Sequence, residues 1–279
     1  MTDPRAQRRD ALIARLQTAK GAPLIMGVLN ITPDSFSDGG AFLDPAEAIA
    51  HAHAMVHDGA AIIDIGGEST RPGAAQVAAA DELARVIPVV RGLADEVDAA
   101  LSIDTCKAPI AYAAASAGAV VINDVSGLKR DPDLARAASD TDSLVVITYN
   151  RGAVDANINL VDDMRAFCNR AIEFAKDAGV REEHILLDAG IGFAKTFEQN
   201  FLALARLDVL LDYGYPVLVG ASRKSFIGRL TNAPVGDRLG GTIAAHLVAA
   251  RAGVSVLRVH DVAAHHQALA VIEAIGAAG

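Results

Sequence analysis

An abrupt change from apolar to polar residues marks the N-terminal part of this chain. Residues 24–29, LIMGVL, form an apolar run typical of a buried strand. From Asn30 to Gly40 most residues are polar, proline or glycine, so neither a strand nor a long helix can continue. Connections in compact domains usually span about 2–6 residues, and longer ones tend to be functional. On this segment alone, an ordinary solvated surface loop is an equally good interpretation.

The same change recurs along the chain. Strands are predicted over residues 24–29, 61–65, 101–103, 119–122, 144–147, 185–187, 216–219 and 255–259. Helices are predicted over residues 10–20, 45–58, 81–95, 108–117, 132–138, 160–176, 196–211, 237–252 and 262–275. Eight strand–helix units in about 250 residues predict an α/β protein, a TIM (β/α)8 barrel. An open doubly wound sheet is the alternative, but no glycine-rich dinucleotide turn follows the first strand.

Size and charge restrict the possibilities further. The 279 residues are 52% hydrophobic, enough for one core, so we expect a single barrel domain over residues 23–279 after an N-terminal helical extension over residues 1–22. A net charge of −9 argues against nucleic acid or an anionic membrane as the main partner. The two isolated cysteines, Cys106 and Cys168, predict reduced thiols in a cytoplasmic protein. The charged N-terminus is unlike a signal peptide, and no run of 18 apolar residues predicts a membrane span.

Polar side chains gather where the predicted strands end. The active sites of TIM barrels lie at the carboxyl ends of the strands. A buried carboxylate normally needs a partner or a ligand. Any one of these groups could be a structural cap, but eight together favour a site for a flat, nitrogen-rich ring. The strand-end residues are Asn30, Asp64, Asp104, Asn123, Asp188, Lys224, Arg258 and His260.

Seven segments in order resemble those of a known family. They are GVLNITPDSFSDGG, DIGGESTRPGA, SIDT, INDVSG, LDAGIGF, GASRKSF and LRVHDV, between Leu24 and Val262. The chain resembles dihydropteroate synthase, a TIM-barrel transferase of folate biosynthesis and a target of sulfonamides. The resemblance implies that 6-hydroxymethyl-7,8-dihydropterin pyrophosphate condenses with p-aminobenzoate, giving 7,8-dihydropteroate and pyrophosphate. It also implies a homodimer.

The resemblance assigns roles to individual residues. The pterin-pocket positions are matched by Asp104, Asn123, Asp188 and Lys224, whose donors and acceptors suit an amino-pyrimidine edge. The pyrophosphate site is matched by Asn30, Arg258 and His260, with Asn30 as the expected ligand of a Mg²⁺ cofactor. The p-aminobenzoate site is matched by Phe36, Thr70, Arg71, Pro72, Phe193 and Ser225. The groups expected to act in catalysis are Asp104, Lys224, Arg258 and His260.

Some positions depart from the family pattern. Thr148 and Tyr149 stand where Met-His is usual, Ala189 stands for proline and Ala194 for glycine. These departures leave open a non-catalytic pterin-binding homologue. A pterin-binding methyltransferase-type domain that works with a corrinoid partner is a second alternative, because it shares the barrel and the pterin carboxylates, but Asn30, Arg71, Arg258 and His260 favour the synthase.

Several other basic residues are interpreted as surface groups. His53 and His57 are four residues apart on a predicted helix but have no third metal ligand nearby. His265, His266, Arg8 and Arg9 are likewise expected to face solvent.

Overall fold

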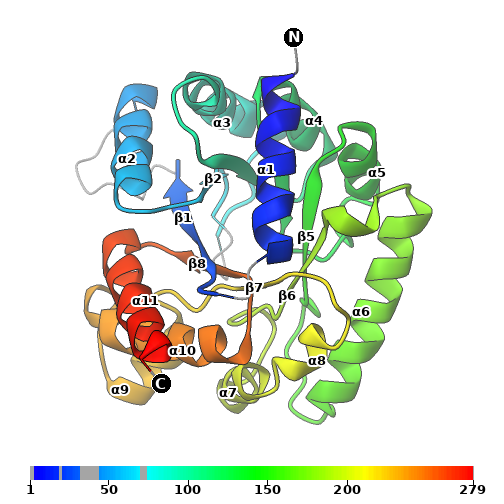
Figure 1. Ribbon diagram of the computed structural model, residues 1–279. Coiled ribbons are helices and arrows are strands. Elements are labelled where there is room, and N and C mark those ends of the chain that lie inside the picture. The colour runs from blue at the N-terminus through cyan, green and yellow to red at the C-terminus, as the bar shows by residue number, and fades with distance from the viewer. Residues whose placement is uncertain (1–2, 19–20, 32–43, 70–73, 279) are drawn as a thin grey trace.

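Eight parallel strands form a closed barrel in the order of the sequence. The computed structural model describes residues 3–18, 21–31, 44–69 and 74–278. Each strand pairs with its neighbour along the chain, and the last strand closes the barrel on the first, as predicted (Figure 1). The strands are β1 (Leu24–Asn30), β2 (Ile62–Gly66), β3 (Ala100–Asp104), β4 (Val121–Asp124), β5 (Leu144–Thr148), β6 (Ile185–Asp188), β7 (Val217–Val219) and β8 (Val256–Val259).

Helices surround the barrel and connect its strands (Figure 1). The α-helices are α1 (Pro4–Thr18), α2 (Pro45–His57), α3 (Ala79–Ala94), α4 (Ala108–Ala117), α5 (Asp133–Asp140), α6 (Leu160–Asp177), α7 (Phe197–Ala205), α8 (Asp208–Leu211), α9 (Ser225–Thr231), α10 (Leu239–Ala252) and α11 (Val262–Ala277). Single 3₁₀ turns lie at Glu182–His184 and Val235–Asp237. No helix among the described residues is long and apolar enough to cross a membrane.

Two helix predictions were wrong in their extent. The helix predicted over residues 196–211 breaks at Arg206, whose backbone (φ −121°, ψ 39°) leaves the helical region, so α7 and α8 are separate. The first helix begins at Pro4 rather than at residue 10, because proline at a helix start sacrifices no hydrogen bond.

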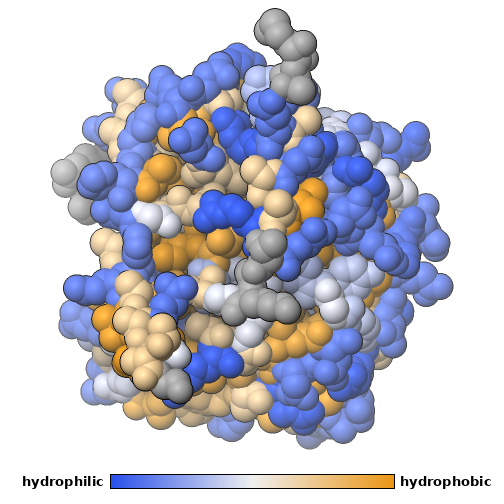
Figure 2. All heavy atoms as spheres, in the orientation of Figure 1, coloured by the Kyte–Doolittle hydropathy of each residue, from blue (hydrophilic) through white to orange (hydrophobic). Residues whose placement is uncertain are grey.

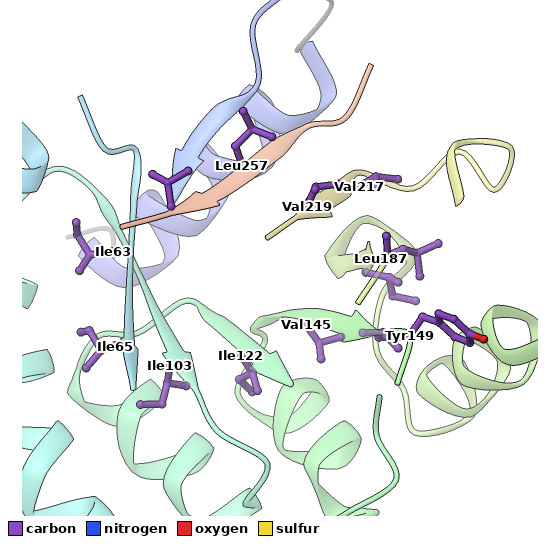
Figure 3. Packing of buried hydrophobic residues seen from close by; sticks show 14 of the residues in the cluster. Ile63, Ile65, Ile103, Ile122, Val145, Tyr149, Leu187, Val217, Val219 and Leu257 are labelled. Atoms are coloured by element: carbon purple, nitrogen blue, oxygen red, sulfur yellow. The ribbon is translucent and has the colours of Figure 1, made fainter. Parts of the chain in front are cut away.

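Side chains alternate between the two faces of every strand, and this alternation creates the site. Outward-facing residues such as Ile63, Ile103 and Leu187 join the core beneath the helices (Figure 3). Inward-facing residues near the amino ends of the strands, including Ile62 and Val146, fill the lower barrel with apolar side chains. Two residues further along the same face, the inward side chains become polar. The barrel is therefore a packed core at one end and a polar chamber at the other.

Helix α1 closes the apolar end of the barrel. Figure 1 shows α1 beside the barrel strands. Leu12 and Leu16 are 3% and 6% exposed and pack on the lower barrel cluster that contains Met26 and Ile62. The expectation that Arg8 and Arg9 are solvated surface groups was wrong. Arg8 donates to the carbonyls of residues 94 and 97, and Arg9 pairs with Asp10 and Asp142. The basic face of α1 therefore serves to anchor the helix to the barrel.

We predict that Leu12→Ala lowers the free energy of unfolding by about 2–5 kcal/mol, because it removes a buried side chain between α1 and the barrel. Urea denaturation measures the change. Val154→Ala is the control: Val154 is 59% exposed, so a change within about 0.5 kcal/mol is expected. Equal losses in the two variants would show that α1 does not stabilise the barrel.

Candidate active site

Asp64 lies at the centre of the polar chamber. Its carboxylate is fully buried and accepts hydrogen bonds from Ser102 Oγ (2.6 Å), Asn123 Nδ2 (2.9 Å) and Arg258 Nε (2.6 Å). These partners come from β3, β4 and β8, so one carboxylate on β2 connects four strands. Asp64 is one of the strand-end residues noted in the sequence, but no individual role was predicted for it. Its geometry shows that it positions Asn123 and Arg258.

Arg258 joins a second carboxylate to this group. Its NH2 donates to Asp104 Oδ2 at 2.7 Å. The other oxygen, Asp104 Oδ1, is buried without a hydrogen-bond partner in the described part of the chain. Burial raises the pKa of Asp104 to about 7, and the Asp64 carboxylate acts in the same direction while Arg258 opposes both. Asp104 therefore has one oxygen paired with Arg258 and one oxygen open to a ligand.

Asp188 occupies the neighbouring side of the chamber. It is 7% exposed and accepts from the Gly190 N–H (3.0 Å) and from Thr148 Oγ1 (3.2 Å). Thr148 is its direct neighbour across the β5–β6 pair. Burial raises the pKa of Asp188, and these two hydrogen bonds lower it. The threonine that departs from the family pattern thus contributes a hydroxyl group to the chamber.

Lys224 bounds the same cleft. Its Nζ donates to the Ile191 carbonyl and lies 4.1 Å from the centroid of the Phe193 ring. Burial lowers the pKa of Lys224 to about 8, while Asp188 raises it. The free volume of the cleft between these side chains is only about 40 Å³. The cleft is lined by Asn123, Val125, Asp188, Phe193, Gly220, Ser222, Lys224, Arg258 and His260.

Lys195 is a charged group that the sequence analysis did not assign to the site. Its Nζ donates to the carbonyls of Gly190 (2.7 Å), Tyr149 (3.3 Å) and Phe193 (3.3 Å). Burial lowers its pKa to about 7. The lysine therefore ties the loop after β6 to the end of β5. Its position after GIGF was visible in the sequence, but the direction of its side chain was not.

The residue before it, Ala194, has φ +45°, in the left-handed region. A glycine would adopt this conformation without strain. The family pattern of glycine at this position therefore has a backbone reason, and this chain accepts the conformation with a methyl group.

Of the predicted anion-binding residues, Asn30 ends β1, Arg258 lies within β8, and His260 lies on the loop that follows β8, next to the loop after β7. His260 Nδ1 lies 2.9 Å from Ser222 Oγ, and Arg223 forms a two-point pair with Asp261. Ser225, predicted to contact p-aminobenzoate, is the first residue of the short helix α9. These contacts hold the two loops together at the rim of the barrel.

A buried histidine pair supports these loops from below. The Ala221 N–H donates to His246 Nε2 (3.0 Å), and His246 Nδ1 lies 2.9 Å from His265 Nε2. His265 Nδ1 in turn lies 2.7 Å from the Asp261 carbonyl. Since Nε2 of His246 accepts, the chain of bonds is satisfied when both rings are neutral. The expectation that His265 faces solvent was wrong, because the alanine-rich α11 gives few cues to its buried face; His265 is 2% exposed.

Four of the residues predicted to contact p-aminobenzoate lie outside the described residues: Phe36, Thr70, Arg71 and Pro72.

The predicted Mg²⁺ ligand can be described. Asn30 is half-buried at the end of β1. A Cβ on Gly66 would lie 3.6 Å from Asn30 Oδ1 and 3.5 Å from the Cβ of Asp104, so the glycine leaves space between them. Within the described ranges, no cluster of three or more His, Cys, Asp or Glu side chains could hold a metal ion.

The barrel and its polar chamber define an enzyme of the (β/α)8 class that acts on a small ligand at the carboxyl ends of its strands. A family model described as "Pterin binding enzyme" matches residues 26–260. Dihydropteroate synthase of Clostridium beijerinckii is 44% identical over 252 residues, covering 90% of this chain and 93% of that protein.

Solved structures give the same result. Dihydropteroate synthase of Clostridium difficile, determined in the presence of pteroic acid, has a TM-score of 0.88 and 46% identity, covering 91% of this chain and 97% of that one. The Xanthomonas albilineans enzyme with 4-aminobenzoic acid also has a TM-score of 0.88, with 43% identity over 92% of this chain and 94% of that one. The chain therefore belongs to the pterin-binding enzymes and, among them, to the dihydropteroate synthases.

We predict that stability falls in acid because the buried histidine pair must become charged. The pKa of His246 is lowered from 6.5 to about 3, chiefly by burial, so below pH 6.5 the unfolded chain takes up a proton that the folded chain does not. The free energy of unfolding should therefore fall by about 2 kcal/mol between pH 6.5 and 5 from this group.

Urea denaturation at the two pH values tests this. His246→Gln should show a smaller loss, and His57→Gln, at an exposed position on α2, should behave like the parent. The same acid dependence in the parent and in His246→Gln would contradict the prediction.

Proposed function

We propose that this chain condenses 6-hydroxymethyl-7,8-dihydropterin pyrophosphate with p-aminobenzoate, giving 7,8-dihydropteroate and pyrophosphate. Membership of the dihydropteroate synthases supports the proposal. The observation that carries it is the convergence of Asp104, Asn123, Asp188 and Lys224 with Arg258 at one end of the barrel. Carboxylate, amide and ammonium groups around one cleft complement an amino-pyrimidine ring, and the adjacent guanidinium suits a pyrophosphate.

We assign the pterin to the cleft between Asn123 and Asp188. Asn123 uses its amide N–H on Asp64, which leaves its carbonyl oxygen to accept from the ring. Asp188 accepts from ring N–H and amino groups. The free space of about 40 Å³ is far below the roughly 300–1,000 Å³ of typical ligand sites. Lys224 therefore leaves the Ile191 carbonyl and the Phe193 ring to donate to the pterin instead.

The pyrophosphate is assigned to Arg258, His260 and Asn30. Two nitrogens of Arg258 already serve Asp64 and Asp104, so NH1 is the group available to an anion. Space beside Asn30 is preserved by Gly66, and Asp104 Oδ1 has no partner there among the described residues. These features fit Mg²⁺, which is usually held by few protein groups together with phosphate. Asn30 would hold the ion, which would neutralise charge on the leaving group.

The chemistry is assigned as an ionising displacement. The bond between the exocyclic methylene carbon and the pyrophosphate oxygen breaks, and the electron pair leaves with the pyrophosphate. Positive charge then spreads into the pterin ring, where Asp104 and Asp188 stabilise it. The amine of p-aminobenzoate attacks the methylene carbon and loses a proton. Phe193 and Ser225 are the described residues assigned to p-aminobenzoate; Phe36, Thr70, Arg71 and Pro72 complete the assignment from sequence.

We also propose a homodimer in the cytoplasm. Large apolar side chains are exposed on α9, α10 and α11, and Figure 2 shows apolar residues along α11. The exposed apolar side chains are Leu230 on α9, Leu239 and Val248 on α10, and Val271 and Ile275 on α11. Unpaired, buried Cys106 and Cys168 suit a reducing compartment. Sedimentation velocity on Val271→Glu tests the interface: a shift from dimer to monomer supports it, and a monomeric parent excludes it.

Release of pyrophosphate tests the activity. The purified chain is given pterin pyrophosphate, p-aminobenzoate and Mg²⁺, with each substrate omitted in turn. We expect one pyrophosphate per 7,8-dihydropteroate, and little release without p-aminobenzoate. Pterin binding without product would instead favour a non-catalytic homologue or a methyltransferase-type domain.

We predict that Asp188→Asn weakens pterin binding by about 10-fold to 150-fold, because it removes a charged double acceptor from the ring's donors. Calorimetry on the free pterin measures the change. Burial raises the pKa of Asp188, so loss of its charge should leave the fold intact, as a thermal melt can check. Asp212→Asn, at an exposed carboxylate, is the control. Unchanged pterin affinity in Asp188→Asn would place the ring elsewhere.

A further inference from the structure

A second cavity lies outside the chamber, between α6 and the loops that follow β4 and β5. Its volume is about 430 Å³, much larger than the free space in the active-site cleft. Lys129, Arg151, Arg170 and Asp163 line it together with Phe167 and Phe174. None of these residues borders the active-site cleft. The cavity is therefore a separate feature of the molecule.

The helix pattern of α6 points to this cavity. Residues 160, 164, 167, 171 and 174 share one helix face, and the first four are buried in the core. Phe174, the fifth residue of this face, is 39% exposed and lines the cavity. Phe167, one of the buried four, presents part of its ring to the same space. The apolar face of the helix thus continues into the wall of an open cavity.

Positive charge dominates the polar part of the wall. Three cations, Lys129, Arg151 and Arg170, line the cavity with a single carboxylate in a protein whose net charge is −9. That carboxylate, Asp163, is already engaged: Tyr149 Oη donates to Oδ2 at 2.6 Å, and Arg151 NH1 lies 3.1 Å from Oδ1. Outside the lining, Asp155 Oδ2 lies 3.8 Å from Arg151 NH2.

The cations keep unused donor capacity. Arg151 Nε is buried without a hydrogen-bond partner in the described part of the chain, and NH1 has only the ion pair with Asp163, which is not a hydrogen bond of good geometry. Lys129 donates to the neutral carbonyl of Asn150. Its Nζ also lies 5.2 Å from the centroid of the Phe167 ring. Burial lowers the pKa of Lys129, and Arg151 and Arg170 act in the same direction while Asp163 opposes them. An anion placed among these groups would relieve their mutual repulsion.

We propose that this cavity is a second binding site, for a small aromatic carboxylate. The carboxylate would accept from Arg151 and Arg170, and the ring would lie against Phe167 and Phe174. A guanidinium matches a carboxylate by paired donation. Two phenyl rings give the apolar surface that a flat ring needs. Inorganic phosphate would use the cations but leave both rings in water.

The cavity also has a structural connection to the active site. The Tyr149 ring packs edge-on against Phe167, with 5.3 Å between centroids, and the Tyr149 backbone N–H donates to the Asp188 carbonyl. Asn150 Nδ2 donates to the carbonyl of Val125, which lines the active-site cleft. The two sites are therefore neighbours joined through residues 149 and 150.

Benzoate is the probe for the test. Its binding to the full chain is measured by ligand-observed NMR with 7,8-dihydropteroate at saturating concentration, so that the active site is filled. Acetate, inorganic phosphate and benzylamine are the comparison ligands. We expect benzoate to bind more tightly than acetate or phosphate, and benzylamine not to bind.

Two surface variants locate the site. Arg170→Gln should weaken benzoate about tenfold, the loss expected for a charge-assisted hydrogen bond. Phe174→Ala should weaken benzoate several-fold and leave acetate unchanged. Arg165→Gln is the matched control, because Arg165 lies on the same helix but outside the cavity, beside Asp212.

Three results would overturn the proposal. They are no benzoate binding when the active site is filled, equal losses in Arg170→Gln and Arg165→Gln, and phosphate binding as tight as benzoate with no effect of Phe174→Ala. Both tested side chains are exposed, so neither substitution should prevent folding.

Discussion

The two ion pairs between Arg258 and the carboxylates of Asp64 and Asp104 are the interaction on which the polar chamber depends. Three charged groups lie in the barrel interior, with Arg258 Nε and NH2 at 2.6 and 2.7 Å from the two carboxylates. An isolated charge in such a place would be costly, and removing one partner of a buried pair typically costs about 3–5 kcal/mol. Asp64 spreads the connection to Ser102 and Asn123. The group therefore fixes the orientation of Asn123 before any substrate arrives.

This arrangement changes how Arg258 should be interpreted. The sequence suggests a strand-end arginine that binds an anion. In the structure the same arginine also neutralises two buried carboxylates, so its truncation would disturb the fold and the anion site together. A loss of pyrophosphate affinity in Arg258→Ala would not by itself identify Arg258 as an anion ligand. His260, which is held by Ser222 at the rim, is the cleaner residue for that question.

The barrel could be predicted because its signal is repeated eight times and nearly every strand end carries one of the named polar residues. The strand-end residues could be named for the same reason. What the sequence could not give are the directions of side chains outside that pattern. Arg8 and Arg9 look solvated until α1 is seen to lie across the barrel end. His265 looks exposed because α11 is rich in alanine, and Lys195 follows a loop whose path depends on the carbonyls that it binds. Those directions depend on contacts between segments far apart in the sequence.

The departures from the family pattern have local physical consequences. Thr148 places a hydroxyl group 3.2 Å from Asp188, and Ala194 holds a left-handed conformation beside Lys195. Thr148 contacts Asp188 at the end of β6, and Ala194 follows Phe193 in the loop after this strand. Since Lys195 binds three carbonyl oxygens of this region, the loop keeps its shape although the residue before the lysine is not glycine. The chamber therefore keeps the donors and acceptors of Asp188 and Lys195 although the residues at positions 148 and 194 depart from the family pattern.

The charge state of Asp104 links the resting chamber to the proposed chemistry. Burial raises the pKa of Asp104 and Arg258 lowers it, so the arginine is the group that stabilises the ionised carboxylate in the resting protein. A cation that develops on the pterin methylene would favour the ionised form and lower this pKa. The two effects are linked. The cation lowers the pKa of Asp104 by a certain free energy, and the ionised carboxylate stabilises the cation, relative to the protonated carboxyl group, by the same free energy. A carboxylate with a low pKa would already be stabilised by solvent or by partners in the resting protein. The cation would then add less stabilisation when it forms. The unpartnered oxygen of Asp104 is thus costly in the resting protein and favourable in the transition state, which is the difference that accelerates a reaction.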